Sequence, residues 1–420
     1  MLNVLLVANN PLSEVDNNGK TISSMFSTLP DVKVLQLYFR DGYPNFNLDT
    51  MYYLISDKAA LMNMPGLFIE SSCAIPPPLI SEKKWQRNAK NSHFIRLLRE
   101  VVWKIYDWEG KNNSFLEKLP LQQGIFFCAG DSLFAYDIVD SILDKYALPL
   151  IVYITDDYIY PQLSWNPLAI FRRKLVRRRM VSICERADHV ITISDKMRDI
   201  YSEKFGISST ASAQISKDHK SQVVRKYDKP LELVYAGGLH YARDKVLSRL
   251  ISAIEIINRR YQAQLFVLRV FSKQNTEFFE SVIKSSKSND VVYEGLSNEI
   301  DEELKNADIL VFAESSDLKN LKATWLSLST KVPEYLSFGK PILNLGSMES
   351  NSVSTLSGVA INSLDNVESI VHALERILQD ESVLDVSGNR SYQLYKDKFS
   401  EEAGKELITT IFKEVYNYGT

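Results

Sequence analysis

Short apolar runs alternate with longer amphipathic stretches along this chain. The runs in the first half are apolar at successive positions and rich in Val and Ile, which is typical of strands buried on both faces of a parallel sheet. They span residues 3–8, 32–38, 124–129, 149–154 and 189–194. Between most of them, as in 132–147, apolar residues recur three and four positions apart. This alternation predicts an α/β domain, doubly wound around a parallel sheet.

The pattern stops in a polar stretch at 208–229 and starts again after Pro230. Six further apolar runs follow, at 231–237, 263–271, 290–295, 307–313, 341–346 and 358–362, and the segment 365–418 has a helical pattern throughout. We therefore expect two Rossmann-like domains. The expected boundaries are 1–215 for the first domain, 216–229 for a linker, 230–395 for the second domain and 396–420 for a last helix that can cross back to the first.

Composition agrees with two ordinary globular domains. The chain has 420 residues, 45% hydrophobic and 24% charged, which excludes a disordered or fibrous protein. Its net charge of −3 argues against a generally basic nucleic-acid-binding protein. Cys73, Cys128 and Cys184 are too far apart for a sequence-local zinc cluster, and their odd number favours buried thiols in a reducing compartment. With no signal-like or membrane-spanning segment, a cytoplasmic location is expected, either free or on a membrane surface.

Two facing parallel sheets suit a two-substrate enzyme or a closing binding protein, because open α/β sheets bind ligands beyond the carboxyl ends of their strands. The absence of a signal-like segment disfavours a periplasmic binding protein. The turn after the first strand, ANNPLSEVDNNGKT, contains the single glycine Gly19, so it lacks the GxGxxG fingerprint of dinucleotide-binding proteins. No Walker A motif occurs anywhere in the chain.

Three segments of the second half together resemble a known family. They are PLELVYAGGLHYARDKVLSRLISAIE (230–255), VVYEGLSNEIDEELKNADILVFAES (291–315) and STKVPEYLSFGKPILNLG (329–346). In this order they are similar to the nucleotide-sugar half of GT-B glycosyltransferases of the retaining family 4, of the type found in bacterial polysaccharide synthesis. Residues 186–206 resemble the family's last strand and helix before the linker. The resemblance covers most of 120–400, and residues 1–120 match poorly.

The segment 329–346 is the most specific part of this resemblance. Ser329 and Thr330 precede a helix, with Pro333 suited to its first turn. The free amide groups at such a helix start, together with Lys331, would suit a diphosphate. The family gives the glutamate at the position of Glu334 a role in binding the ribose hydroxyls. The alternative is an ordinary capped helix with a surface glutamate.

Further donor-binding candidates follow from the resemblance. An Arg/Lys pair after the first strand of this half would hold the pyrophosphate and stabilise the leaving group, and Arg243 and Lys245 are the nearest matches. Other candidates lie at strand ends, where a tight turn or a surface position is the alternative. They are Gly238, which would let the backbone approach phosphate, Gly295 and Leu296 near the base, and Glu314 and Ser315 lining the cleft.

One position departs from the family pattern. A second glutamate usually lies eight positions before the ribose-binding one and contacts the donor sugar, but Leu326 stands there in this chain. The substitution leaves recognition of the donor sugar open.

Candidates in the first half are fewer. Gly19 and Lys20 lie where the family's glycine-containing loop approaches the donor phosphates. Asp156 and Asp157 follow a buried strand, where an acidic side chain could orient or deprotonate an acceptor hydroxyl. The histidine that the family often has there is absent, and aspartates at strand ends also cap helices.

Two basic stretches concern partners. Residues 171–180 carry six Arg or Lys and no acid, and 81–108 combine basic residues with Trp85, Phe94, Trp103 and Trp108. Either could rest on anionic lipid, form a solvated helix face or pair with acids elsewhere. Neither lies in a nucleic-acid-binding module.

Together these features predict a glycosyltransferase that moves a sugar from a nucleoside diphosphate, UDP above all, to a hydroxyl of a glycan or a lipid-linked glycan. We expect retention of configuration and neither a metal nor a cofactor. Two alternatives stay open. One is a catalytically inactive GT-B partner subunit. The other is an inverting transferase with Asp156 or Asp157 as its base.

Overall fold

The structure is a computed structural model, and its chain divides into two compact units. Unit 1 comprises Met1–Gln214 and Gly404–Thr420, and unit 2 comprises Ile215–Ala403. The residues that the structure describes are 2–14, 17–29, 31–40, 42, 44–46, 49–69, 93–119, 124–130, 132–157, 166–220, 227–273, 275–286 and 289–418. Cys73, Trp85 and the first part of the basic stretch, 81–92, lie outside them.

Unit 1 is built on an eight-stranded sheet with the order β4-β3-β2-β1-β5-β6-β7-β8. All neighbouring strands are parallel except β3 and β4, which are antiparallel. The strands are β1 (Leu2–Ala8), β2 (Val32–Tyr38), β3 (Thr50–Leu54), β4 (Leu67–Ile69), β5 (Gly124–Ala129), β6 (Leu150–Ile154), β7 (His189–Thr192) and β8 (Thr210–Ala211). The sequence pattern predicted five of these, and β3, β4 and β8 are additional.

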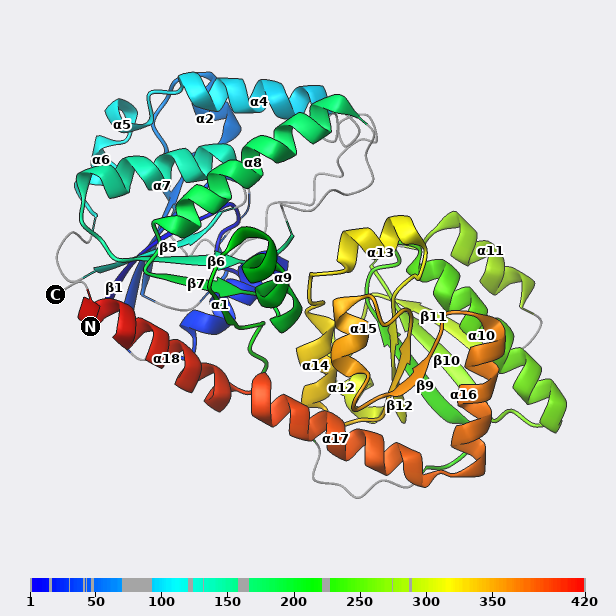
Figure 1. Cartoon of the computed structure of the whole chain (residues 1–420). Helices are drawn as coiled ribbons and strands as arrows, with labels where there is room; N and C mark the ends of the chain where they lie inside the picture. Colours follow the sequence, from blue (N-terminus) through cyan, green and yellow to red (C-terminus); the bar gives the residue numbers. More distant parts are fainter. Residues whose placement is uncertain are drawn as a thin grey trace. The chain divides into compact units, whose positions relative to one another are not determined.

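Helices cover both faces of this sheet, with α7 and α8 on one face and α1 and α18 on the other (Figure 1). The helices of unit 1 are α1 (Asn17–Phe26), α2 (Asp57–Leu61), α4 (His93–Ile105), α5 (Trp108–Lys111), α6 (Asn113–Leu116), α7 (Leu133–Lys145), α8 (Pro167–Glu185), α9 (Asp195–Phe205) and α18 (Glu401–Tyr418).

The last helix, α18, belongs to the core of unit 1 although it follows unit 2 in the chain. Ile408, Ile411 and Val415 repeat at helical spacing on its buried side. Phe412, on the same side, stacks on Phe127 of β5 with ring centroids 6.3 Å apart. This aromatic contact fixes the end of the chain to the first sheet.

Unit 2 contains a six-stranded, fully parallel sheet with the order β11-β10-β9-β12-β13-β14. Its strands are β9 (Leu231–Ala236), β10 (Phe266–Phe271), β11 (Val291–Gly295), β12 (Ile309–Ala313), β13 (Ile342–Leu345) and β14 (Ile361–Ser363). Numbered along the chain, the strand order is 3-2-1-4-5-6, which is the arrangement of dinucleotide-binding folds. Successive strands are added on one side of β9 up to β11 and on its other side from β12 onward, so the order of the strands reverses between β9 and β12. Ligands of such sheets bind at this switch point, beyond the carboxyl ends of the strands.

The helices of unit 2 connect these strands. They are α10 (Arg243–Tyr261), α11 (Glu277–Ser285), α12 (Ile300–Asn306), α13 (Leu318–Thr324), α14 (Lys331–Ser337), α15 (Asn351–Leu356), α16 (Val367–Gln379) and α17 (Ser382–Lys398). The described part of the expected linker packs on this unit. The amide of Ser216 donates to the carbonyl of Phe399 at 2.9 Å, and the hydroxyl of Tyr395 donates to the carbonyl of Ser216 at 2.9 Å.

The buried side-chain amide of Asn258 joins α10 to the start of β10. We expect a substitution that removes this amide to destabilise unit 2. The side-chain oxygen of Asn258 accepts from the amides of Leu265 and Phe266 at 2.9 and 3.2 Å, and its NH₂ donates to the carbonyl of Phe266 at 3.0 Å. We expect Asn258→Ala to lower the free energy of unfolding by about 1–3 kcal/mol, because buried backbone groups lose their partners. Urea denaturation measures this. The exposed Asn306→Ala is the control, and equal losses in both variants would contradict the prediction.

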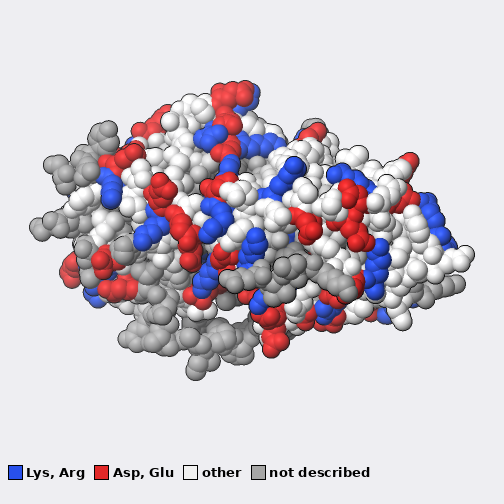
Figure 2. Space-filling view, turned by 90° about the horizontal axis from the view of Figure 1, so that it is seen from below, with Lys and Arg blue, Asp and Glu red and all other residues white. Residues whose placement is uncertain are grey.

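The two described cysteines are buried, and the surface charge of the described residues is mixed (Figure 2). Cys128 and Cys184 are free and buried, and burial raises the pKa of each thiol to about 12. On the face seen in Figure 2, basic and acidic side chains are interspersed over the described residues. No helix among the described residues combines the length and the apolarity needed to cross a bilayer.

Candidate nucleotide site in unit 2

The sheet of unit 2 opens at its switch point. Strands β9 and β12 pair only at Leu233 with Ile309 and at Val234 with Leu310. Beyond these pairs the Tyr335 hydroxyl of α14 takes the place of the missing strand contact. It accepts from the amide of Ala236 at 3.0 Å and donates to the carbonyl of Ala236 at 3.2 Å. The buried α14 is thereby held at the carboxyl end of β9.

Arg243 and Glu314 meet at this opening. Arg243 begins α10, just after β9, and Glu314 directly follows β12. The guanidinium Nη2 lies 3.3 Å from the Glu314 carboxylate, and the side chains are 15% and 4% exposed. The pKa of Glu314 is raised, because the effect of burial exceeds the opposite effects of Arg243 and of the hydroxyls of Ser350 and Ser352. Arg243 thus lies beside a buried carboxylate, with a small part of its side chain open to solvent.

The loop before α14 is connected to the same group of side chains. The amide of Ser329 donates to the Ser352 hydroxyl at 3.0 Å, and Ser352 also contacts Glu314. The ammonium group of Lys331 lies 3.1 Å from the carboxylate of Glu334, whose side chain is 12% exposed. Thr330 occupies the N-cap of α14 without a side-chain hydrogen bond to the helix. Because the amide of Lys331 also donates to the Ser329 hydroxyl at 3.4 Å, Arg243, Glu314, Ser329, Lys331 and Glu334 lie along one connected network.

The turn between β9 and α10 is tightly built. Tyr241 and Ala242 both have φ of 57°, the left-handed region. A Cβ atom on Gly238 would lie 2.5 Å from the ring of His240, so a larger residue at this position would displace that ring. The Tyr235 hydroxyl donates to the carbonyl of Gly238 at 2.8 Å. Burial, and then the neighbouring Arg243, lower the pKa of His240.

Of the remaining candidates in unit 2, Lys245 and Leu296 lie apart from this network. Lys245 is exposed on α10, and Leu296, after β11, is 70% exposed. Gly295 ends β11 at the sheet's carboxyl edge. Ser315 is buried beside Glu314, and its hydroxyl accepts from the amide of Asp317 at 3.2 Å. Among the described residues, no contact joins Lys245 or Leu296 to the network.

Leu326 is fully buried. Its side chain is therefore part of the apolar interior. In the family that the sequence resembles, the residue at this position is usually a glutamate that contacts the donor sugar.

The candidates of unit 1 follow β1 and β6, two strands separated in the sheet by β5. Gly19 lies in α1, where a Cβ atom would come within 2.5 Å of the Pro11 carbonyl oxygen. Close packing thus accounts for this glycine, and Lys20 beside it is partly exposed. Asp157 accepts a hydrogen bond from the Tyr201 hydroxyl at 3.0 Å, and Asp156 is partly exposed.

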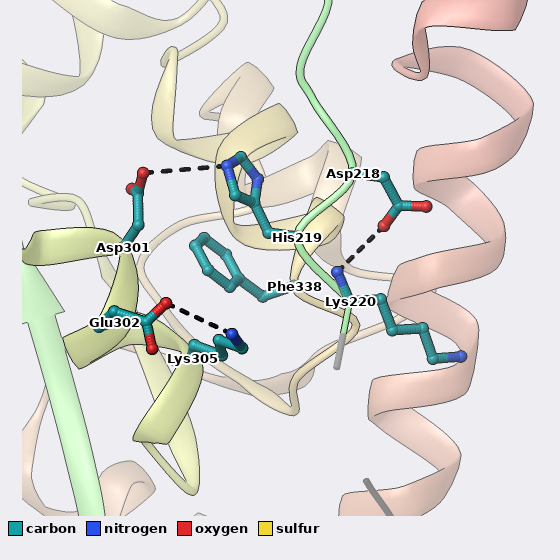
Figure 3. Close-up of a pocket in the computed structure, with 7 residues that line it drawn as sticks. All are labelled: Asp218, His219, Lys220, Asp301, Glu302, Lys305 and Phe338. Atoms are coloured by element: carbon teal, nitrogen blue, oxygen red, sulfur yellow. Dashed lines mark hydrogen bonds and ion pairs between the residues drawn. The ribbon is translucent and has the colours of Figure 1, made fainter. Parts of the chain in front are cut away.

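A separate cavity of about 390 Å³ lies elsewhere on unit 2 (Figure 3). Its lining residues are Asp218, His219, Lys220, Asp301, Glu302, Lys305 and Phe338. The ring of His219 stacks on Phe338 with centroids 4.7 Å apart, and its Nε2 lies 3.9 Å from the Asp301 carboxylate. None of the predicted donor-binding residues lines this cavity.

Sequence reasoning missed Ser350 and Ser352 of the network, and it missed Tyr335, which holds α14 at β9. Ser350 and Ser352 follow β13, and nothing in their local sequence indicates that they turn toward Glu314. Tyr335 follows Glu334 directly, so the matching segment 329–346 contained it. Its hydroxyl contact with β9, 99 residues away in the chain, appears only in the structure.

Comparison with solved structures identifies the fold. The chain is similar to Alr3699/HepE of Anabaena, solved with UDP, at 11% identity and a TM-score of 0.60, over 98% of this chain and 100% of that one. It is also similar to a UDP-forming α,α-trehalose-phosphate synthase of Burkholderia xenovorans, at 10% identity and a TM-score of 0.62, over 100% of both chains. Sucrose-phosphate synthase of Thermosynechococcus elongatus matches over 100% of both chains, at 11% identity and a TM-score of 0.58.

These similarities, with the two Rossmann-like sheets, define a GT-B fold. The fold class expected from the sequence is thereby confirmed. No protein-family model matches the chain, and no curated protein sequence matches it either.

Proposed function

We propose that this protein is a glycosyltransferase that uses a UDP-sugar as donor and a hydroxyl of a glycan or lipid-linked glycan as acceptor, with retention of configuration and without a metal. The observation that carries the proposal is the network at the switch point of unit 2. It brings Arg243, Lys331 and Glu334 to the sheet edge where nucleotides bind in related folds. The sequence of 329–346, which resembles family 4, supplies two of these three side chains.

Each of these side chains has a chemical role in the proposal. Arg243 and Lys331 neutralise the negative charge that develops on the departing diphosphate. Glu334 accepts hydrogen bonds from the ribose hydroxyls, in place of its present contact with Lys331. UDP is the proposed nucleotide because HepE was solved in complex with UDP and UDP-glucose, and the trehalose-phosphate synthase forms UDP.

A thermal-shift comparison of UDP, GDP, ADP and CMP tests the donor class. We expect UDP to raise the melting temperature by about 5 to 10 °C at a concentration about 100 times its Kd, because a ligand bound only by the folded state stabilises it by about 2.7 kcal/mol under those conditions. The other nucleotides should shift it less. Glu334→Ala should remove most of the UDP effect, and the exposed Glu302→Ala should keep it. Stabilisation by none of the four nucleotides would contradict the proposal.

A second candidate function is a catalytically inactive GT-B partner subunit, favoured by the buried Leu326. Such a subunit could bind UDP but would not turn over any donor. Release of UDP from a UDP-sugar by the purified chain, lost in Glu334→Ala, would exclude it. If the chain is active, the anomeric configuration of the product distinguishes retention from inversion with Asp156 or Asp157 as base.

A further inference from the structure

Helix α4 exposes its apolar side to solvent. Phe94, Leu98, Val101 and Ile105 recur at spacings of four, three and four residues, so they form one stripe along the helix. They are 45–78% exposed, whereas Trp103 on the opposite side is buried. An amphipathic helix of a globular protein normally turns its stripe toward the core, so this stripe indicates a partner.

The first turns of α8 extend the apolar area. Leu168 and Phe171 are 41% and 55% exposed. The two helices lie together on one side of unit 1 (Figure 1) and are joined by the ion pair of Arg172 with Glu100, 2.9 Å apart. We define the α4–α8 surface as these apolar side chains together with three cations that follow them on α8. Its residues are Phe94, Leu98, Val101, Ile105, Leu168, Phe171, Lys174, Arg177 and Arg178.

The exposed charged side chains of α4 and α8 are all basic except Glu185, the last residue of α8. Lys174, Arg177 and Arg178 are exposed, and they make no ion pair with any residue that the structure describes. Helix α8 has no acid before Glu185, and the one acid of α4, Glu100, is 11% exposed and paired. Other basic residues of α8 pair internally, as Arg179 does with Asp137 and Asp140. The cations left over thus border the apolar area, and neither helix carries an exposed acid before Glu185.

We propose that the α4–α8 surface docks unit 1 onto an anionic lipid bilayer. Exposed apolar side chains bordered by Lys and Arg match the boundary between acyl chains and headgroups, where the former bury apolar area and the latter meet negative charge. A second protein chain would bury the apolar stripe equally well, but it gives no reason for three unpaired cations beside it. The proposal rests on these residues alone and does not depend on the transferase reaction.

Co-sedimentation of the full chain with vesicles tests this inference. We expect binding to vesicles of phosphatidylglycerol and phosphatidylcholine in equal parts, and weak binding to phosphatidylcholine alone. Raising the salt from about 0.1 M to about 1 M shortens the screening length from about 10 Å to about 3 Å and should weaken the binding. No sedimentation with the anionic vesicles at low salt would overturn the proposal.

Two pairs of substitutions assign the binding to this surface. Phe94→Ser with Val101→Ser should weaken vesicle binding by more than about tenfold, because the exposed apolar area is lost. Lys174→Gln with Arg178→Gln should weaken it by about 25-fold at low salt, at about fivefold for each cation. The matched controls are Phe278→Ser with Val386→Ser in unit 2 and Lys405→Gln with Lys413→Gln in α18, all at exposed positions. Equal losses in the controls would overturn the assignment.

The same variants separate a membrane from a second copy of the chain. We expect the native chain to elute at the mass of a monomer in light scattering, and the serine variants to do the same. A dimer of the native chain that the serine substitutions dissociate would show that the surface joins two copies. An unchanged circular dichroism spectrum and melting temperature in all variants show that they fold, and since neither measurement needs UDP, this test is independent of the proposed function.

Discussion

Arg243→Ala should lower the turnover of a UDP-sugar by about two to three orders of magnitude. A fixed cation that meets developing charge acts mainly in the transition state, and removal of one such donor has an effect of that size. In the structure Arg243 is held in place by Glu314 at 3.3 Å. The measurement is the release of UDP at saturating donor. Because the nucleotide keeps its other contacts, the affinity for UDP should change less than the turnover.

The control for this prediction must separate chemistry from stability. Removal of Arg243 leaves Glu314 buried without its cation, and that alone costs stability. The double variant Arg243→Ala with Glu314→Gln removes the buried charge as well, so its melting temperature should recover while turnover stays low. Arg259→Ala, at the exposed end of the same helix, should be as active as the native chain. Turnover of Arg243→Ala within about threefold of native would contradict the role given to Arg243.

Tyr335→Phe should lower the free energy of unfolding by about 2–4 kcal/mol. The substitution removes one hydroxyl that satisfies both the amide and the carbonyl of Ala236, and each buried backbone group left without a partner costs about 1–3 kcal/mol. Burial raises the pKa of Tyr335 far above neutral, so the hydroxyl is protonated and donates at every physiological pH. Chemical denaturation followed by circular dichroism measures the loss.

The effect should extend to the nucleotide site, because Tyr335 adjoins Glu334 and ties α14 to β9. A weaker UDP-induced thermal shift in Tyr335→Phe would show this connection. Tyr241→Phe is the matched control, since Tyr241 lies in the adjacent turn with 46% of its surface exposed. A loss below about 1 kcal/mol in Tyr335→Phe, or an equal loss in both variants, would mean that the hydroxyl does not carry the contact.

The strands that the sequence predicted best are those buried on both faces. The expected run 32–38 coincides with β2, and the expected run 231–237 exceeds β9 by one residue. Continuous apolar runs leave a strong signal because both faces of such a strand are covered by helices. Strands β3 and β4, of five and three residues, gave no such signal. Strand β4 is the edge strand and β3 lies next to it, and both are short and partly exposed, so neither needs a long continuous apolar run.

Prediction of the candidate site depended on how local its signal was. Ser329, Thr330, Lys331 and Glu334 lie within six residues, so a single motif could indicate all of them. Arg243 and Glu314 were also expected near the site, each from its own strand end, but their mutual contact was not. Ser350 and Ser352 were not expected at all, because a serine after a strand has many possible partners.

The sequence by itself determined two Rossmann-like domains, because the period and length of its apolar runs record which residues must be buried. It also placed a candidate nucleotide-binding motif in the second domain. Only the tertiary structure decided how the side chains combine. It showed that β9 and β12 separate at the switch point, that Tyr335 fills the opening, and that α4 turns an apolar stripe to solvent. Contacts of this kind join residues far apart in the chain, as Tyr335 and Ala236 are, and their energies depend on distance and burial in space, which no local pattern records.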